Sequence, residues 1–318
     1  MVNVVATYLT LPLKKKINNT LNTSLNKTLS NTLITLALVA SFAASANKAL
    51  AQYNILPSKV TEAQARKNIV LTGEIKQGGL MVGKTLPGNT VTLNGKAITV
   101  SAKGDYTFGF SRDDKKSYQL VITSVNGDRV AKTLTPEKRS YNIQRIEGIK
   151  KSIMQPNPKS VARARQDSKQ VKAARKVASD FTYFAQGFIA PIEGTITGVY
   201  GSQRIYNGVP KNPHFGLDYA GKIGDPVKAP ASGTVLLWVP DMFYSGGTMI
   251  IDHGQGVSST FLHLSNTYVK QGDKVKQGDI VAAVGESGRA TGPHLDWRIN
   301  WFNVKIDPAL VLKIQPLI

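Results

Sequence analysis

Apolar and polar residues alternate over short stretches along most of this chain, which is typical of strands rather than helices. The clearest stretch is VTLNGKAITV, residues 91–100, in which two runs of strand-forming residues flank an Asn-Gly pair at 94–95. Such a pair predicts a two-residue hairpin turn of type I′. A second Asn-Gly pair at residues 126–127 predicts another turn. We therefore expect residues 52–149 to form a small antiparallel β-sandwich.

The pattern changes abruptly between residues 150 and 176, where nine Lys or Arg residues accompany a single acid, Asp167. We interpret residues 150–186 as a basic linker that is helical after Pro158. Two interpretations of this helix remain open. It is either an arm held against an anionic polymer or a solvated helix that keeps two domains apart.

From residue 187 the β pattern returns and contains an internal repeat. GDPVK at residues 224–228 is echoed by GDKVK at residues 272–276. Each copy begins a run that predicts one turn and two strands. Two copies predict a closed unit built twice from one plan rather than a solenoid. The whole chain is therefore expected to be mainly β.

The stretch HLDWRINW, residues 294–301, separates polar from apolar residues with a period of two. One face would carry His294, Asp296, Arg298 and Asn300, and the other Leu295, Trp297, Ile299 and Trp301. A shift of one residue would bury all four polar side chains, so the register is well defined. We expect the polar face to line a cleft or to meet solvent.

The four histidines of the chain all lie in this last region. His214 and Asp218 are four apart in PHFGLDYA, in extended or looped backbone. His263 is expected on a strand, on the same face as Phe261. His253 precedes GQG and is expected to be a structural turn residue. Three histidines and two carboxylates beside glycine-rich turns nevertheless indicate a functional site.

Composition narrows the possible chemistry. The chain has no cysteine, which excludes disulfides, thiolate metal ligands and a cysteine nucleophile, so a metal must be held by His, Asp or Glu. The formal charge is +20, and removal of the five lysines in residues 1–51 leaves +15. Such a charge favours an anionic partner. For an exported protein, we expect cell wall or membrane surface and no nucleic acid.

Residues 1–51 have the order of a secretory signal peptide. A basic segment precedes the uncharged run at residues 33–46, and Ala-Leu-Ala at 49–51 predicts cleavage after Ala51. The run is too short to span a bilayer. Export without a transmembrane anchor is therefore the main expectation, and a retained anchor is the alternative.

Six segments of the C-terminal region resemble the LytM/lysostaphin-type zinc metallopeptidases, which cleave peptide cross-links in peptidoglycan. They are QRIYNGVPKNPHFGLDYA, GDPVKAPASGTV, IDHGQG, FLHLS, VKQGDKVKQGDIVAAVG and ESGRATGPHLDW. The resemblance covers about residues 187–310 and implies an antiparallel β-sheet groove with a duplicated hybrid motif over residues 187–318. It also implies one Zn²⁺ per chain, with other divalent ions as alternatives.

The resemblance assigns roles residue by residue. His214 and Asp218 would be metal ligands, and His263 and His294 would be catalytic. The family closes its site with His-x-His, whereas this chain has His294-Leu295-Asp296, so the departure falls on the third ligand. Aspartate can ligate zinc, but a second carboxylate makes the centre less positive and less selective. We interpret Asp296 as a substituted ligand.

Two functions follow, and a third is weaker. The first is a zinc metalloendopeptidase that hydrolyses peptidoglycan cross-links through a metal-activated water, in the periplasm or cell envelope of a Gram-negative bacterium. The second is a catalytically silent relative that binds cell wall or activates a separate amidase. Stem peptides, and an amidase or a regulatory envelope protein, are the expected partners. A lipoyl- or biotin-carrier domain lacks a suitable lysine hairpin and leaves the histidines unexplained.

Overall fold

The computed structural model describes residues 69–148 and 157–317. Both stretches belong to one compact unit, Pro57–Ile318, which is distinguished from a second unit, Met1–Leu56. The expected signal peptide and the expected boundary between sandwich and linker lie outside the described residues. No helix within the described stretches has the length and apolar character to cross a membrane. The described protein is mainly β, as expected.

The described residues between 70 and 134 form two antiparallel sheets, which confirms the expected sandwich. One sheet contains β1 (Val70–Thr72), β2 (Leu80–Lys84) and β5 (Asp105–Gly109); the other contains β3 (Thr90–Leu93), β4 (Lys96–Ile98), β6 (Tyr118–Thr123) and β7 (Arg129–Leu134). Tyr106, Phe108 and Phe110 pack against Leu120 from the opposite sheet, and all four are fully buried.

Both expected Asn-Gly turns are present. Leu93 pairs with Lys96 across the first turn, where Asn94 and Gly95 have φ values of 49° and 75°. Positive φ at both central residues is the requirement of a type I′ turn, which only Gly and Asn meet readily. The second turn joins β6 to β7 and also contains a glycine with positive φ, Gly127.

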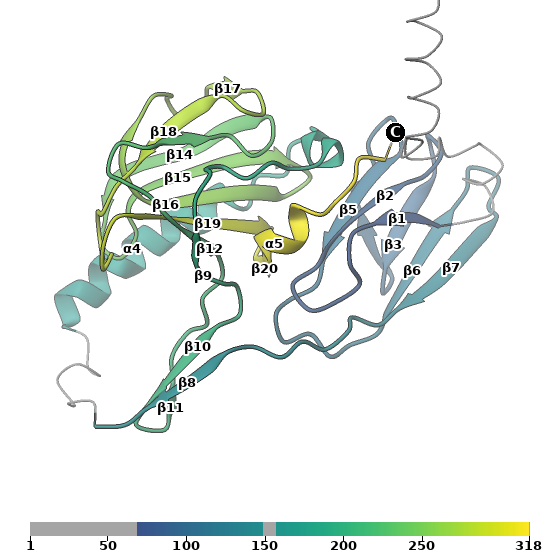
Figure 1. Ribbon diagram of the computed structural model, residues 1–318. Coiled ribbons are helices and arrows are strands. Elements are labelled where there is room, and N and C mark those ends of the chain that lie inside the picture. The colour runs from purple at the N-terminus through teal and green to yellow at the C-terminus, as the bar shows by residue number, and fades with distance from the viewer. Residues whose placement is uncertain (1–68, 149–156, 318) are drawn as a thin grey trace, which may run out of the picture. The chain divides into compact units, whose positions relative to one another are not determined.

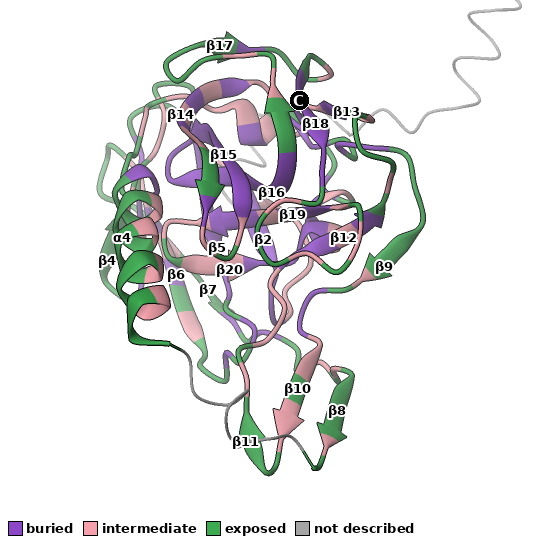
Figure 2. Ribbon diagram, turned by 90° about the vertical axis from the view of Figure 1, so that its left-hand side faces the viewer, coloured by how far each residue is buried: buried purple, intermediate pink, exposed green. Residues whose placement is uncertain are grey.

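The C-terminal region is built on one large antiparallel sheet (Figure 1). Its main path runs β17-β14-β15-β16-β19-β12-β9. The strands are β9 (Ile196–Gly198), β12 (Leu217–Ala220), β13 (Pro226–Lys228), β14 (Gly233–Met242), β15 (Gly246–Gly254), β16 (Val257–Thr267), β17 (Lys274–Val275), β18 (Ile280–Val284), β19 (His294–Trp301) and β20 (Val304–Ile306). Figure 2 shows how much of β15 and β16 is buried.

Smaller elements complete the described chain. A fourth sheet joins β8 (Ile143–Ile146), β10 (Gln203–Tyr206) and β11 (Val209–Pro210), with β8 and β10 parallel. A 3₁₀ turn, η1 (Tyr183–Gln186), precedes the large sheet, and a short helix, α5 (Pro308–Val311), follows it. Leu80 and Val82 of β2 belong to the core of the large sheet, so this core extends to the sandwich.

The repeated GD motif forms the same turn twice. Gly224 and Gly272 have φ values of 97° and 95°, and the aspartate that follows each accepts a backbone N–H three residues before it, at 2.7 Å in both copies. The short strand of each copy pairs with the long strand of the other, β13 with β18 and β17 with β14. The two copies of the repeat therefore exchange their short strands.

The basic linker contains α4 (Pro158–Ala174), as expected after Pro158. The Asn157 side chain accepts the Lys159 N–H and caps the first turn. Its C-terminal end is docked, because Ala174 packs on Leu237 and Ile250 of the large sheet, while most of its other residues are exposed. In Figure 2 the outward side of α4 is exposed and the side toward the sheet is partly buried.

Candidate active site

Two carboxylates face each other on adjacent strands of the large sheet. Asp218 of β12 and Asp296 of β19 are direct antiparallel partners. Side chains of such partners lie on the same face with Cβ atoms about 5 Å apart, and like charges there are destabilising. Asp296 is only 3% exposed, so solvent does not screen the pair well. A positive charge beside the two carboxylates would therefore stabilise this strand pairing.

His214 supplies a nitrogen to this pair from the loop before β12. Its backbone is fixed by two hydrogen bonds, to Gly201 and Ser202, each 2.8 Å long. Its Nδ1 lies 3.3 Å from the Val199 carbonyl oxygen, which can only accept, so Nδ1 carries the proton. In the neutral ring Nε2 then keeps its lone pair, 3.0 Å from Asp218 Oδ1 and 3.5 Å from Asp296 Oδ2.

These three residues fit a divalent metal. Their ligand atoms all lie within 4.8 Å of one another. His214 Nε2 and Asp218 Oδ1 are buried, lie 3.0 Å apart and have no other hydrogen-bond partner, so both are available to an ion. Three nitrogen and oxygen ligands with an open position are also the donor set of catalytic zinc. The structure thus brings together the three residues expected as ligands.

The same geometry perturbs the histidine when no ion is bound. Burial alone would lower the pKa of His214, but the carboxylates of Asp218 and Asp296 outweigh it and raise that pKa to about 10. A proton on Nε2 then takes the place of a metal. Metal binding must displace this proton.

Arg298 is a site residue that the sequence interpretation did not single out. Its Nε lies 2.9 Å from Asp296 Oδ1 and its Nη2 lies 2.5 Å from Oδ2, a two-pronged ion pair. Although burial would raise the pKa of Asp296, the charges of Arg298 and His214 hold it well below its usual range. The period-two pattern had placed Arg298 on this face but did not predict the pair.

Glycines leave room for the carboxylates. A Cβ atom on Gly216 would lie 2.3 Å from Asp296 Oδ1, and one on Gly198 would lie 2.1 Å from Asp218 Oδ2. Neither distance is tolerable between non-bonded atoms. Any larger residue at these two positions would push a candidate ligand out of place.

His263 does not lie where period two predicts. Its neighbour Leu262 pairs with Asp296, so a regular strand would turn His263 to the opposite face, with Phe261. Instead the register of β16 shifts between Phe261 and Leu264, and His263 has a φ of 63°. A bulge of this kind re-aims a side chain. The expected face was therefore wrong.

The bulge brings His263 beside His294, with ring centroids 4.7 Å apart. His263 Nδ1 lies 2.8 Å from the Ser287 carbonyl oxygen, and His294 Nδ1 lies 2.8 Å from that of Gly292. Both carbonyls accept, so Nδ1 of each ring carries a proton and Nε2 is not held by this bond. Burial lowers the pKa of His263, which favours its neutral form.

His253 is a structural residue, although it lies within β15 rather than in a turn. It is fully buried, with Nδ1 2.8 Å from the Ser232 carbonyl oxygen and Nε2 2.8 Å from Ser259 Oγ. Burial lowers its pKa to about 4. Both ring nitrogens are satisfied, so none remains for a ligand. Trp297 belongs to the core of the large sheet, and Trp301 is partly buried against this core.

Residues 212–308 match the model of peptidase family M23. The chain is 39% identical over 87 residues to the peptidoglycan DD-endopeptidase ShyA of Vibrio cholerae, covering 27% of this chain and 20% of ShyA. It is 36% identical over 103 residues to the DD-carboxypeptidase/endopeptidase Mpg of Neisseria meningitidis, covering 32% of this chain and 24% of Mpg. The matched region therefore spans about a fifth to a quarter of each of these relatives.

A crystal structure of a Pseudomonas aeruginosa protein assigned to peptidase M23 is similar over a longer stretch. It has a TM-score of 0.58 and 26% sequence identity, and the match covers 77% of this chain and 96% of that chain. Every residue expected in the site lies between 212 and 308. The chain therefore carries a peptidase family M23 domain of the LytM type over residues 212–308.

Proposed function

We propose that this chain is a zinc endopeptidase that hydrolyses peptide cross-links of peptidoglycan. The observation that carries the proposal is the convergence of His214, Asp218 and Asp296, two of which present buried atoms that contact each other and have no other partner. The M23 match and the names of the two curated relatives support the reaction class and the substrate. Peptidoglycan stem peptides are accordingly the proposed substrates.

His214, Asp218 and Asp296 would hold the ion. A zinc ion held there supplies a Lewis acid, which polarises a peptide carbonyl and makes water more acidic. Arg298 orients the Asp296 carboxylate and offsets its negative charge. The pair of Asp296 and Arg298 then adds no net charge to the centre. In this respect it resembles the neutral imidazole that the family places at position 296.

His263 and His294 would act on the peptide. Each holds a protonated Nδ1 against a backbone carbonyl and keeps its Nε2 available. One ring can take the proton of the attacking water, and the other can donate a hydrogen bond to the carbonyl oxygen as charge develops on it. The neutral state of His263, favoured by burial, suits proton transfer near neutral pH.

The test combines metal analysis with hydrolysis of cross-linked muropeptides by the full chain. His263→Ala and His294→Ala should keep the metal and lose turnover by about a hundredfold or more. Asp296→Ala should lose the metal, whereas Asp241→Ala, at an exposed carboxylate outside the site, should keep both metal and rate. Full metal content and full rate in Asp296→Ala would overturn the ligand assignment.

One observation favours a second function, that of a catalytically silent protein that binds wall or activates a separate amidase. The guanidinium of Arg298 already occupies both oxygens of Asp296, and a metal must share this carboxylate with it. A purified chain that binds no metal and leaves muropeptides intact, yet stimulates a wall amidase, would support this function against the first.

We further propose that the protein is exported to the periplasm or cell envelope of a Gram-negative bacterium, where the substrate lies. The positive charge of the chain suits an anionic wall. Fractionation of cells expressing the full chain should recover it outside the cytoplasm. Recovery only in the cytoplasmic fraction would contradict this location.

A further inference from the structure

The sheet face that carries Asp296 continues beyond the candidate site. Arg298 lies two residues further along β19, directly opposite Thr260 of β16, and Thr260 lies opposite Ile250 of β15. Directly opposed residues in antiparallel strands point to the same face. Since Ile250 packs on Ala174, α4 covers part of the face that holds the metal-binding residues.

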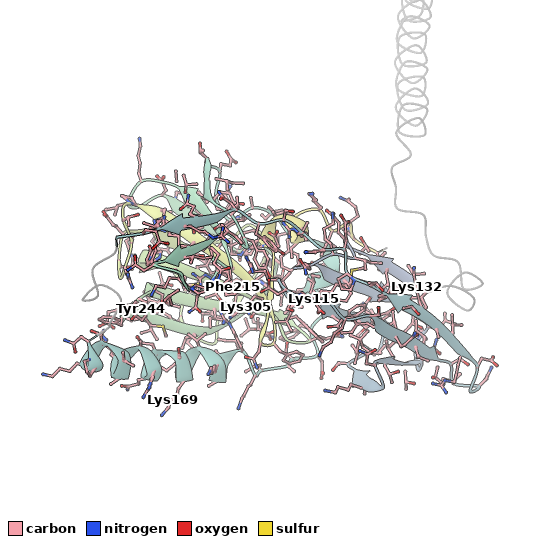
Figure 3. The ribbon with its side chains drawn as sticks, turned by 90° about the horizontal axis from the view of Figure 1, so that it is seen from below. Lys115, Lys132, Lys169, Phe215, Tyr244 and Lys305 are labelled. Atoms are coloured by element: carbon pink, nitrogen blue, oxygen red, sulfur yellow. The ribbon has the colours of Figure 1, made fainter. Side chains whose placement is uncertain are left out.

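A cavity of about 620 Å³ opens beneath α4. This volume is typical of a small-molecule site rather than of a single-ion site. Figure 3 labels two lining residues, Tyr244 and Lys305, and also Lys169, an exposed residue of α4 that does not line the cavity. The lining comes from α4, from the β14–β15 connection and from β20, and includes Lys172, Arg175, Lys176, Tyr244, Ser245 and Lys305.

The cavity adjoins the catalytic histidines through its wall. Ser245 lines the cavity, and its backbone carbonyl oxygen accepts the backbone N–H of His263 at 2.8 Å. Tyr244 also lines the cavity, and its backbone carbonyl oxygen accepts the backbone N–H of Arg289. Arg289 lies two residues after Ser287, whose carbonyl oxygen contacts His263 Nδ1. A ligand in the cavity therefore lies next to the backbone that positions His263.

Positive charge in the lining is not balanced. Four cations face one carboxylate, Asp167, whose Oδ2 already accepts the Phe243 N–H at 2.8 Å. Within residues 69–148 and 157–317, no carboxylate forms an ion pair with Lys172, Arg175, Lys176 or Lys305. Such an uncompensated cluster attracts an anion.

Buried polar atoms around the cluster also lack partners. Arg175 donates from Nη2 to Thr260 Oγ1, but its Nε is buried and unbonded. Asn300, the strand partner of Lys305, has a buried Oδ1 without a partner. Burial, followed by the charges of Arg175 and Arg298, lowers the pKa of Lys305 to about 7. Each of these states is costly, and an anion beside the cations would relieve the charge repulsion.

We propose that this cavity binds a free carboxylate of an acidic peptide that lies along the same sheet face as the catalytic histidines. The inference rests on the proposed function, because cross-linked stem peptides carry free carboxylates on their glutamate and diaminopimelate residues. Met242, Tyr244 and Val171 supply apolar wall for the carbon chain of such a peptide. The basic helix α4 thus contributes a substrate-binding site.

The test measures binding by calorimetry with the metal-free full chain in the presence of a chelator. The probe is the tripeptide L-Ala-γ-D-Glu-meso-diaminopimelate, compared with its fully amidated form and with inorganic phosphate. Lys305→Met, which keeps the length of the side chain, should weaken binding of the acidic tripeptide about tenfold. Lys169→Gln removes one charge from the outer face of the same helix and should leave binding unchanged.

Three results would overturn the site: equal affinity of Lys305→Met and the native chain, equal affinity of the amidated and acidic tripeptides, or no binding to the native chain. Phosphate binding as tight as tripeptide binding would reassign the site to a phosphate ligand. Lys172→Gln provides a second, exposed variant that should also weaken binding. Because the binding test contains no metal, its result does not depend on catalysis. If the tripeptide binds but the metal-loaded chain does not hydrolyse muropeptides, only the endopeptidase is refuted. If the metal-loaded chain hydrolyses them and Lys305→Met leaves the KM unchanged, only this site is refuted.

Discussion

At the scale of single residues, the pair of Asp296 and Arg298 distinguishes this site from one closed by a His-x-His motif. The sequence shows the aspartate in place of a histidine, and its period of two places Arg298 on the same face. The sequence does not show that Arg298 bonds both oxygens of Asp296, because this depends on side-chain torsions. The two residues act as one neutral group, so they should be substituted together.

We expect Asp296→His alone to destabilise the metal-free chain. The substitution leaves the Arg298 guanidinium, which is 29% exposed, without its partner carboxylate. Loss of one partner from a buried ion pair typically costs about 3 kcal/mol. Asp296→His with Arg298→Met should recover much of this loss. Urea unfolding with a chelator measures both.

The matched control is Asp241→Asn, which breaks the exposed ion pair with Arg163 and should leave the free energy of unfolding nearly unchanged. If Asp296→His alone is as stable as the native chain, Arg298 does not depend on Asp296.

At the scale of elements, local signals were predictable and distant pairings were not. The Asn-Gly hairpin and the GD turns follow from the φ preferences of a few adjacent residues. The docking of α4 on β14 and β15 depends on contacts between residues more than 60 apart, such as Ala174 with Leu237, and its charge pattern alone left two interpretations open. The residues around His263 include no glycine, so the sequence gives no sign of the bulge there.

His263 should therefore respond unusually to small substitutions. An alanine with positive φ costs about 1 kcal/mol or more, whereas glycine adopts this conformation freely. We expect His263→Gly to be at least as stable as His263→Ala. At Thr260, a neighbouring position of the same strand with ordinary φ, the glycine variant should be the less stable by about 1 kcal/mol. The same order at both positions would contradict the strained bulge.

At the scale of the whole molecule, the sandwich and the large sheet share buried contacts. Gln255 Nε2 donates to the Asp105 carbonyl oxygen at 3.1 Å, and Arg112 Nη2 donates to that of Gly201 at 2.6 Å. Arg139 also pairs with Asp307, a buried carboxylate, at 2.7 Å. These contacts between segments distant in sequence could not be read from composition or periodicity. They favour unfolding of residues 69–148 and 157–317 as one cooperative unit.

The stability of this unit should fall in acid because of His253. Its folded pKa, about 4, lies below its unfolded value of 6.5, so the unfolded chain binds a proton that the folded chain excludes. Stability is therefore lost as the pH falls from 6.5 to 4, by about 3 kcal/mol. In His253→Gln this component should disappear. Equal pH dependence of unfolding in both proteins would contradict the assignment.

The exchanged strands of the duplication also limit how the domain can be divided. A peptide holding only one copy would keep its long strand but lose the short strand that covers its edge, since β13 and β17 each come from the other copy. Two such peptides could restore the missing pairings only by dimerising and trading strands. The single polypeptide therefore supplies both partners of an exchange that two separate copies would have to make by dimerising.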